Sequence, residues 1–215
     1  MNTTSTVISK AQLERTNTQL EHASPEQIIA WALANSERPL LTTSFGPQAG
    51  VLLHAVLSID PTVPVLWVDH GFNTNATYRF AKQLIKRFDP ELHIYSPKLS
   101  SAWILSQLGG VPDLDDPKHA EFAEQVKLEP FERALNELKP DLWLAGIRQD
   151  ETDHRRSLSI VSEGRPGLTR VAPFFHHSEE QMEEYLLAHA VPTENNYFDP
   201  TKGLANRECG LHAPS

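Results

Sequence analysis

Short apolar runs alternate with amphipathic stretches along most of this 215-residue chain. Apolar runs bounded by turn-forming residues are typical of strands buried on both faces, whereas apolar positions three and four apart indicate helices. Strands are predicted over 39–45, 63–69, 92–95, 141–145 and 168–172. Helices are predicted over about 24–35, 48–59, 119–138 with a break near Pro130, and 178–189, and another begins at a cap formed by Asn73 or Thr74.

Two of the predicted helices begin with a strong capping signal. Ser24 with Gln27, and Ser178 with Gln181, have the spacing of a capping box. Strands and helices that alternate at this length indicate an α/β fold. We therefore predict a single domain in which a mostly parallel sheet is flanked by helices.

The predicted domain covers residues 1–190 and is followed by a C-terminal tail, residues 191–215, rich in proline and asparagine. Because the tail has few apolar residues, we expect the part from about Asn195 onward to be mobile without a ligand. Ligands of parallel sheets bind beyond the carboxyl ends of the strands. The strand-to-helix junctions are therefore the places where functional residues are expected.

The first junction, residues 42–48, reads Thr-Thr-Ser-Phe-Gly-Pro-Gln. Hydroxyl groups, backbone N–H groups and the dipole of the following helix can together hold an oxyanion at such a junction. The sequence lacks the Gly-Lys-Ser/Thr of a Walker A loop. A plain strand-to-helix turn is the alternative interpretation.

Two further junctions carry charged side chains. At the second, Asp69 either accepts hydrogen bonds from a ribose or base or caps the following turn. The third, residues 146–156, opens a stretch in which five of the eleven arginines fall between Arg148 and Arg170. Guanidinium groups bind phosphate and sulfate through paired hydrogen bonds, so this concentration favours a small anionic ligand. The alternative is a solvated loop whose arginines pair with its own acidic residues.

The chain as a whole is acidic, with 19 basic and 28 acidic residues and a formal net charge of −9. That charge disfavours nonspecific binding to nucleic acids and to anionic membranes. No apolar run has the length of a transmembrane helix, and the first ten residues lack the basic start and apolar stretch of a signal peptide. We expect a cytoplasmic protein with no nucleic acid or membrane partner.

The chain has one cysteine, Cys209. One thiol excludes an intramolecular disulfide and a four-cysteine zinc or iron–sulfur site within one chain. Cys209 lies in a polar segment, and Arg207 and His212 are close enough in sequence to favour its thiolate. Cys209 and His212 have a metal-like spacing, but no second ligand pair accompanies them, so no metal site is predicted. Any redox reaction would take its second thiol from another molecule.

Five segments of the chain match motifs of one known enzyme family. Glu-Cys-Gly-Leu-His at 208–212 is similar to its catalytic motif, and residues 42–48 are similar to its modified pyrophosphatase loop. The other matching segments are Asp69-x-Gly71 followed by Thr-Tyr-Arg-Phe at 77–80, Lys-Leu-Glu-Pro at 127–130 followed by Arg-Ala-Leu at 133–135, and Gly146-x-Arg148 followed by Thr152 and Arg155. With these matches in the family order from about residue 39 to residue 212, the chain resembles the assimilatory 3′-phosphoadenylylsulfate (PAPS) and adenylylsulfate (APS) reductase family.

The resemblance implies an adenine nucleotide α-hydrolase-like fold and a cluster-free branch, usually specific for PAPS. It implies thioredoxin-dependent reduction of PAPS to sulfite and adenosine 3′,5′-bisphosphate in assimilatory sulfate reduction, through an S-sulfocysteine on Cys209. Thioredoxin or glutaredoxin would be the electron donor, and a homodimer is implied.

The resemblance also implies roles for residues outside the catalytic motif. Ser44, Gly46 and Gln48 would hold the phosphosulfate, with Phe45 of the same loop counted among the substrate-binding residues. The charge of the substrate would be neutralised by Lys127, Arg148 and Arg155. The nucleoside would contact Asp69 or Gly71. The thiolate would be stabilised by Arg207 or His212.

One departure from the family is a shorter segment before the catalytic motif, without a Ser-x-Gly-x-x-x-Thr-like piece that helps to hold the substrate. Three alternatives to PAPS reduction stay open. They are an APS reductase, an ATP-pyrophosphatase-like adenylyltransferase that uses ATP and Mg²⁺ without Cys209, and a catalytically silent nucleotide-binding protein.

Overall fold

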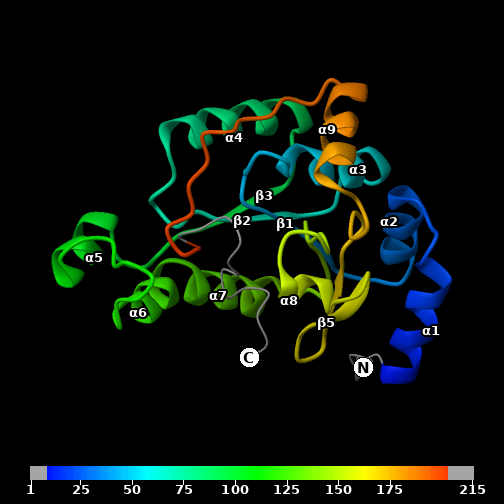
Figure 1. The fold of residues 1–215 in the computed structure, drawn as a ribbon, viewed down its shortest axis with the longest axis horizontal. Coiled ribbons are helices and arrows are strands. Elements are labelled where there is room, and N and C mark those ends of the chain that lie inside the picture. Colours follow the sequence, from blue (N-terminus) through cyan, green and yellow to red (C-terminus); the bar gives the residue numbers. More distant parts are fainter. Residues whose placement is uncertain (1–8, 203–215) are drawn as a thin grey trace.

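The computed structural model describes residues 9–202 of the chain. In this part, six strands form one sheet in the order β3-β2-β1-β4-β6-β5 (Figure 1). Neighbouring strands are parallel except β5 and β6, which form an antiparallel hairpin. The strands are β1 (Pro39–Thr43), β2 (Val65–Val68), β3 (Leu92–Tyr95), β4 (Leu142–Leu144), β5 (Val161–Arg165) and β6 (Leu168–Val171).

Helices cover both faces of the sheet. In Figure 1, α3, α4 and α9 lie on one side, and α6 and α7 lie on the other. The helices are α1 (Lys10–Leu20), α2 (Pro25–Ala34), α3 (Ala49–Ile59), α4 (Asn75–Phe88), α5 (Ser101–Leu108), α6 (His119–Ala123), the π-helical η1 (Glu124–Leu128), α7 (Glu129–Leu138), α8 (Asp153–Arg156) and α9 (Glu179–Ala188). The predicted α/β domain with a mostly parallel sheet is therefore confirmed.

The predicted helix starts are also present. Ser24 and Gln27 at α2, and Ser178 and Gln181 at α9, form complete capping boxes. Thr74, one of the two predicted caps, accepts a hydrogen bond from the backbone N–H of Thr77 at the start of α4.

Besides the short helix α8, three elements of the described chain were not predicted, because each buries little apolar surface. α1 buries only Leu20, and α5 buries only Ile104. β5 is an edge strand with a single fully buried residue, Val161, and it returns into β6 through a turn whose Gly167 has a φ of +77°. Their apolar periodicity is weak, and secondary structure is predicted from sequence mainly by that periodicity.

The predicted helix break near Pro130 is wrong, because the helix is not interrupted there. The chain stays helical from α6 through η1 into α7, and Pro130 lies in the first turn of α7, where its missing N–H group is tolerated. The irregularity is the π-helical turn just before it, which carries the buried Lys127. π-helical turns inserted in α-helices are common at functional sites. The predicted loop after β4 is likewise interrupted by the short helix α8.

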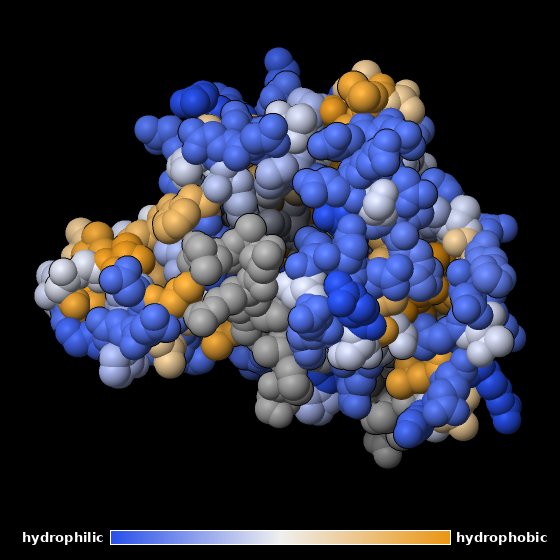
Figure 2. Space-filling model, in the orientation of Figure 1, coloured by the Kyte–Doolittle hydropathy of each residue, from blue (hydrophilic) through white to orange (hydrophobic). Residues whose placement is uncertain are grey.

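The core is centred on the middle strands. Trp143 of β4 is fully buried, its indole N–H donates to the Thr42 hydroxyl of β1 at 2.7 Å, and its ring packs on Phe131 of α7. The face of the molecule drawn in Figure 2 is mostly hydrophilic, with a group of apolar side chains over α5. Trp103 of α5 and the neighbouring Leu99 and Val111 are exposed. No helix in residues 9–202 has the length and apolar character needed to cross a membrane.

Candidate active site

A pocket of about 420 Å³ opens at the carboxyl ends of the central strands. Strand β2 lies beside one edge of β1, and β4 lies beside the other edge. The strand order therefore reverses between β1 and β4. Ligands of open α/β sheets bind at such a point. Six of the predicted site residues line the pocket: Ser44, Gly46, Gln48, Lys127, Arg148 and Arg155.

The loop after β1 forms one wall of the pocket. Gln48 and Ala49, at the N-terminus of α3, line it, and no side chain caps this helix end. An uncapped helix N-terminus favours an anionic ligand. Phe45 does not line the pocket: its backbone has a φ of +50°, and its buried ring packs edge-on against Trp67 at 4.9 Å. The phenyl ring therefore anchors the loop in the core.

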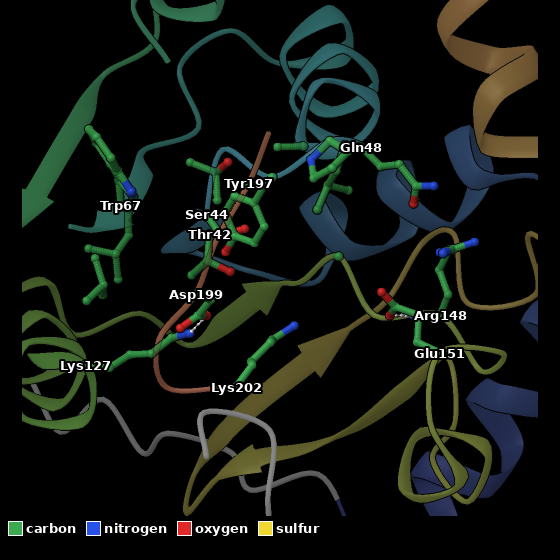
Figure 3. Close-up of a pocket in the computed structure, with 18 of the residues that line it drawn as sticks. Thr42, Ser44, Gln48, Trp67, Lys127, Arg148, Glu151, Tyr197, Asp199 and Lys202 are labelled. Carbon is green, nitrogen blue, oxygen red and sulfur yellow. Dashed lines mark hydrogen bonds and ion pairs between the residues drawn. The ribbon is translucent and has the colours of Figure 1, made fainter. Parts of the chain in front are cut away.

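The loop after β4 supplies two buried arginines. Glu151 accepts hydrogen bonds from the backbone N–H of Arg148 and from the Arg155 guanidinium, as Figure 3 shows for Arg148. The Arg148 side chain is 8% exposed, and its Nη1 lies 3.5 Å from a carboxylate oxygen of Asp150. That Nη1 atom is buried and has no hydrogen-bond partner in residues 9–202. A buried guanidinium with an unused donor is suited to an anionic ligand.

Asp69 and Gly71, at the end of β2, do not line the pocket. Asp69 accepts hydrogen bonds from the Gly71 backbone N–H, the Asn73 amide and the Tyr78 hydroxyl. Burial, together with the charge of Asp69, raises the pKa of Tyr78 to about 12. Gly71 has a φ of +78°, and a Cβ atom there would lie 2.5 Å from the Ser101 hydroxyl. Asp69 therefore caps its own turn, and His70 and Asn73 of the same loop line the pocket instead.

Lys127 forms a buried ion pair with Asp199, shown by a dashed line in Figure 3. The side chains of Lys127 and Asp199 are only 7% and 2% exposed. Burial by itself would raise the pKa of Asp199, but the charge and hydrogen bond of Lys127 and the hydrogen bond of Thr201 outweigh it and lower that pKa to about 2. The pair is therefore charged at neutral pH, and it fixes the C-terminal part of the chain to η1.

That C-terminal part, residues 191–202, is called the strap here. In Figure 1 it runs from α9 past α4 toward the carboxyl end of β2. The Thr193 hydroxyl donates to the carbonyl of Pro47 at 2.7 Å, and the Thr74 hydroxyl donates to the carbonyl of Asn196 at 2.8 Å. Three strap residues line the pocket: Tyr197, Asp199 and Lys202. The strap is one wall of the site.

A family model described as the phosphoadenosine phosphosulfate reductase domain matches residues 38–200. The chain is also 38% identical over 195 residues to a phosphoadenosine 5′-phosphosulfate reductase from Synechocystis sp., with 89% of this chain and 77% of that relative covered. The chain belongs to the phosphoadenosine phosphosulfate reductase family.

Solved structures agree with the family assignment. A PAPS reductase from Candida auris, crystallised as a phosphate complex, has a TM-score of 0.76 at 25% identity, with 87% of this chain and 90% of that chain covered. An FMN adenylyltransferase from Candida glabrata has a TM-score of 0.59 at 16% identity, with 88% of this chain and 61% of that chain covered. The second likeness shows the fold alone. The resemblance inferred from the sequence is confirmed.

Other predicted residues of this PAPS reductase family member lie outside the described residues: Cys209, Arg207 and His212. The described chain ends at Lys202, seven residues before Cys209. In residues 9–202, no group of three or more His, Cys, Asp or Glu side chains is arranged to hold a metal ion.

The structure adds pocket residues that the sequence did not single out: Trp67, His70, Asn73, Glu151, Tyr197, Asp199 and Lys202. His70 and Asn73 lie within the junction after β2, which the sequence had already indicated as a place for functional residues. Their position in that junction is the signal that could have identified them. The strap residues had no such signal, because the sequence shows few apolar anchors there. Its anchors are the hydrogen bonds and the buried ion pair just described.

His70 predicts a pH dependence of stability. Burial, with a smaller contribution from the charge of Lys127, lowers the pKa of His70 from 6.5 to about 4, against the opposing charges of Asp199 and Asp69. As the pH falls below 6.5, the unfolded chain takes up a proton that the folded protein does not, so the free energy of unfolding decreases. Between pH 7 and pH 4.5 this costs about 2 to 3 kcal/mol.

Urea unfolding at both pH values measures this effect. His70→Gln should lose that part of the pH dependence, whereas His93→Gln on β3 is the matched control and should keep it. Equal pH dependence in wild type and His70→Gln would show that His70 does not remain neutral in the folded protein.

Proposed function

We propose that this protein is a PAPS reductase, which reduces PAPS to sulfite and adenosine 3′,5′-bisphosphate with electrons from a dithiol protein. The observation that carries the proposal is the pocket itself, which joins Ser44, Gly46 and Gln48 to two buried arginines, one with an unused donor. Membership of the phosphoadenosine phosphosulfate reductase family and the Glu-Cys-Gly-Leu-His sequence at 208–212 support the same reaction.

The first chemical step is attack by a thiolate. The thiolate of Cys209 attacks the sulfur of the phosphosulfate, so that an S–S bond forms and the bond from that sulfur to the phosphate oxygen breaks. The electron pair of the broken bond leaves with the phosphate, as adenosine 3′,5′-bisphosphate. The enzyme keeps an S-sulfocysteine. Because a free cysteine has a pKa near 8.5, Arg207 or His212 would stabilise the thiolate.

The second step is thiol–disulfide exchange. A thiolate of thioredoxin or glutaredoxin attacks the sulfur atom of Cys209 and releases sulfite, which leaves with the electron pair of the S–S bond. The second thiol of the partner then attacks the mixed disulfide and regenerates Cys209. The partner dithiol is oxidised to a disulfide, and its two electrons account for the reduction of the sulfate sulfur to sulfite.

The positions of the residues in the pocket suggest which of them would bind the phosphosulfate and which would neutralise its charge. The uncapped N-terminus of α3 and the side chains of Ser44 and Gln48 would hold the phosphosulfate, and Arg148 and Arg155 would neutralise it. Lys127 is paired with Asp199, so its charge is already balanced before the substrate arrives. The segment from Lys202 to Cys209 spans up to about 25 Å when fully extended, which is long enough for the thiol to reach a pocket that Lys202 itself lines.

The further assignments concern partners and substrate choice. We propose a homodimer that works in the cytoplasm, with no iron–sulfur cluster, since each chain has one cysteine. APS is the alternative substrate, and it differs from PAPS only in lacking the 3′-phosphate.

Intact mass spectrometry without any added thiol tests the reaction and the substrate together. Incubation with PAPS should add one sulfo group, which peptide mapping should place on Cys209. Addition only with APS would replace the PAPS assignment by APS reduction. No adduct with either compound, in a protein that binds adenosine 3′,5′-bisphosphate, would contradict the covalent reaction and support a silent nucleotide-binding protein.

Replacing Arg148 by alanine should weaken nucleotide binding more than it weakens folding. A charge-assisted hydrogen bond to an anion contributes roughly 1.5–3 kcal/mol, so the dissociation constant should rise on the order of 10–100-fold. The free energy of unfolding should change little, because the Arg148 guanidinium makes a single ion pair within residues 9–202, with Asp150 at 3.5 Å. Calorimetric titration with adenosine 3′,5′-bisphosphate gives the affinity, and urea unfolding gives the stability.

Arg156→Ala is the matched control for this prediction. Arg156 lies on the same loop, but its side chain is 66% exposed and pairs with Asp153 at the surface. Its loss should leave the affinity unchanged. An Arg148→Ala protein that binds normally and melts much earlier would assign Arg148 a structural role.

A further inference from the structure

Two buried polar atoms in the loop between β2 and α4 have no hydrogen-bond partner in residues 9–202: Nε2 of His70 and Oδ1 of Asn73. Both residues line the pocket. Leaving a buried donor or acceptor unpaired destabilises the folded state, so most such groups in folded proteins have a partner. Two unpaired atoms in one pocket-lining loop point to groups on a ligand.

The hydrogen-bonding character of both atoms follows from their neighbours. His70 accepts the backbone N–H of Phe72 on Nδ1 at 3.1 Å, so the neutral ring carries its proton on Nε2, which is a donor. Burial lowers the pKa of His70 to about 4, which keeps the ring neutral near pH 7. Asn73 donates its amide N–H to a carboxylate oxygen of Asp69 at 2.9 Å, which leaves Oδ1 as an acceptor. The loop therefore presents one donor and one acceptor.

The loop is held in this arrangement before any ligand binds. Asp69 accepts from the Gly71 N–H at 3.0 Å, from Asn73, and from the Tyr78 hydroxyl at 3.0 Å. The Ser101 hydroxyl donates to the carbonyl of Gly71 at 2.9 Å. A donor and acceptor fixed by their surroundings bind a matching ligand without the cost of ordering the side chains.

The pocket differs in character between its two sides. The loop after β4 contributes Arg148 and Arg155, whereas the β2 side contributes the apolar residues Leu66, Trp67 and Val68. An apolar wall beside one fixed donor and one fixed acceptor suits a flat, uncharged ring with hydrogen-bonding groups on its edge. The arginine side suits the anionic end of the same ligand.

We propose that His70 and Asn73 recognise the adenine base of the nucleotide: the N6 amino group donates to Oδ1 of Asn73, and the adjacent ring nitrogen N1 accepts the N–H of His70 Nε2. The assignment rests on the proposed function and extends it, since the N1 edge of adenine offers a donor beside an acceptor. Hypoxanthine has an oxygen acceptor in place of the amino group and a proton on N1, and therefore opposes both the acceptor of Asn73 and the donor of His70. His70 and Asn73 determine specificity and take no part in the sulfur chemistry.

Binding to two matched nucleotides tests the assignment. Calorimetric titration of the full-length protein should show adenosine 3′,5′-bisphosphate binding about 10–100-fold more tightly than inosine 3′,5′-bisphosphate. In His70→Leu this ratio should fall by about tenfold, and His70→Gln, which keeps a side-chain N–H, should restore part of it. His93→Leu on β3 is the matched histidine control and should keep the wild-type ratio. A merely structural histidine would change the stability and leave the ratio unchanged.

The outcomes separate this inference from the proposed function. Wild-type protein that binds neither nucleotide would overturn the proposed function, and the inference with it. Wild-type protein that binds both equally well, or a His70→Leu protein with an unchanged ratio, would overturn only the inference. If His70→Leu does not fold, the wild type is titrated with the 1-deaza and 7-deaza analogues of adenosine 3′,5′-bisphosphate. The 1-deaza analogue should bind about tenfold more weakly and the 7-deaza analogue normally, and normal binding of the 1-deaza analogue would overturn the assignment.

Discussion

Cys209→Ser is expected to abolish sulfite formation while leaving the binding of adenosine 3′,5′-bisphosphate nearly intact. Serine keeps the size of the side chain but replaces a polarizable thiolate by a hydroxyl that stays protonated near neutral pH. The two arginines and the α3 N-terminus that would hold the nucleotide are unaffected by this change. Sulfite release with PAPS, thioredoxin and a reductant measures the reaction, and calorimetric titration measures binding.

A trapping experiment adds a second readout for the same variant. Wild-type protein carrying the sulfo group should form a mixed disulfide with a thioredoxin whose resolving cysteine has been removed, and Cys209→Ser should form none. Sulfite production by Cys209→Ser at even a tenth of the wild-type rate would contradict the covalent mechanism. An adenylyltransferase would instead consume ATP in the presence of Mg²⁺ and would not need Cys209, so a separate assay with ATP and Mg²⁺ tests that interpretation.

The central strands and most helix starts could be predicted from sequence because their signals are local. Buried runs such as Val65–Val68 and Leu142–Leu144 are uninterrupted apolar segments, and Ser24 and Ser178 carry their capping partner three residues ahead. β5 could not be predicted, because its burial comes from pairing with β6 along an edge of the sheet and not from its own composition.

The sequence could predict which strand-to-helix junctions form the candidate site. It could not predict which side chains of a junction face the pocket. In the loop after β2, Asp69 and Gly71 were the candidates, and Asp69 has the more obvious chemistry. The structure turns Asp69 toward Gly71, Asn73 and Tyr78, so that His70 lines the pocket in its place. Which residue of a turn faces a ligand depends on backbone dihedrals, such as the φ of +78° at Gly71, that the sequence does not specify.

Lys127 shows how a tertiary contact can change the role expected of a residue. The sequence indicated a cation for the substrate, and the structure does bring that ammonium group to the pocket. Its partner, Asp199, is 72 residues away along the chain, in a segment without helical or strand periodicity. A contact of that sequence separation leaves no local pattern. The lysine therefore joins two walls of the site, η1 and the strap.

Lys127→Met should lower the free energy of unfolding by about 3–5 kcal/mol at pH 7, because breaking a buried ion pair leaves an uncompensated charge. Asp199, with a side chain only 2% exposed, would keep only its hydrogen bonds with Thr201 among the contacts described. Replacing both partners, as in Lys127→Met with Asp199→Leu, should recover most of the loss, since well-packed apolar groups can substitute for a buried pair. Urea unfolding of the three proteins measures the effect.

Lys98→Met is the matched control for the lysine. Its ammonium group pairs with Glu129 at 2.9 Å, but the Lys98 side chain is 71% exposed, so its loss should cost less than about 1 kcal/mol. The sign of the pH dependence follows from the lowered pKa of Asp199 of about 2: the contribution of this carboxylate is present above pH 4 and is lost as the pH falls toward 2. A Lys127→Met protein as stable as the wild type would show that Asp199 does not depend on Lys127, and that the strap is fixed to the domain by its other hydrogen bonds.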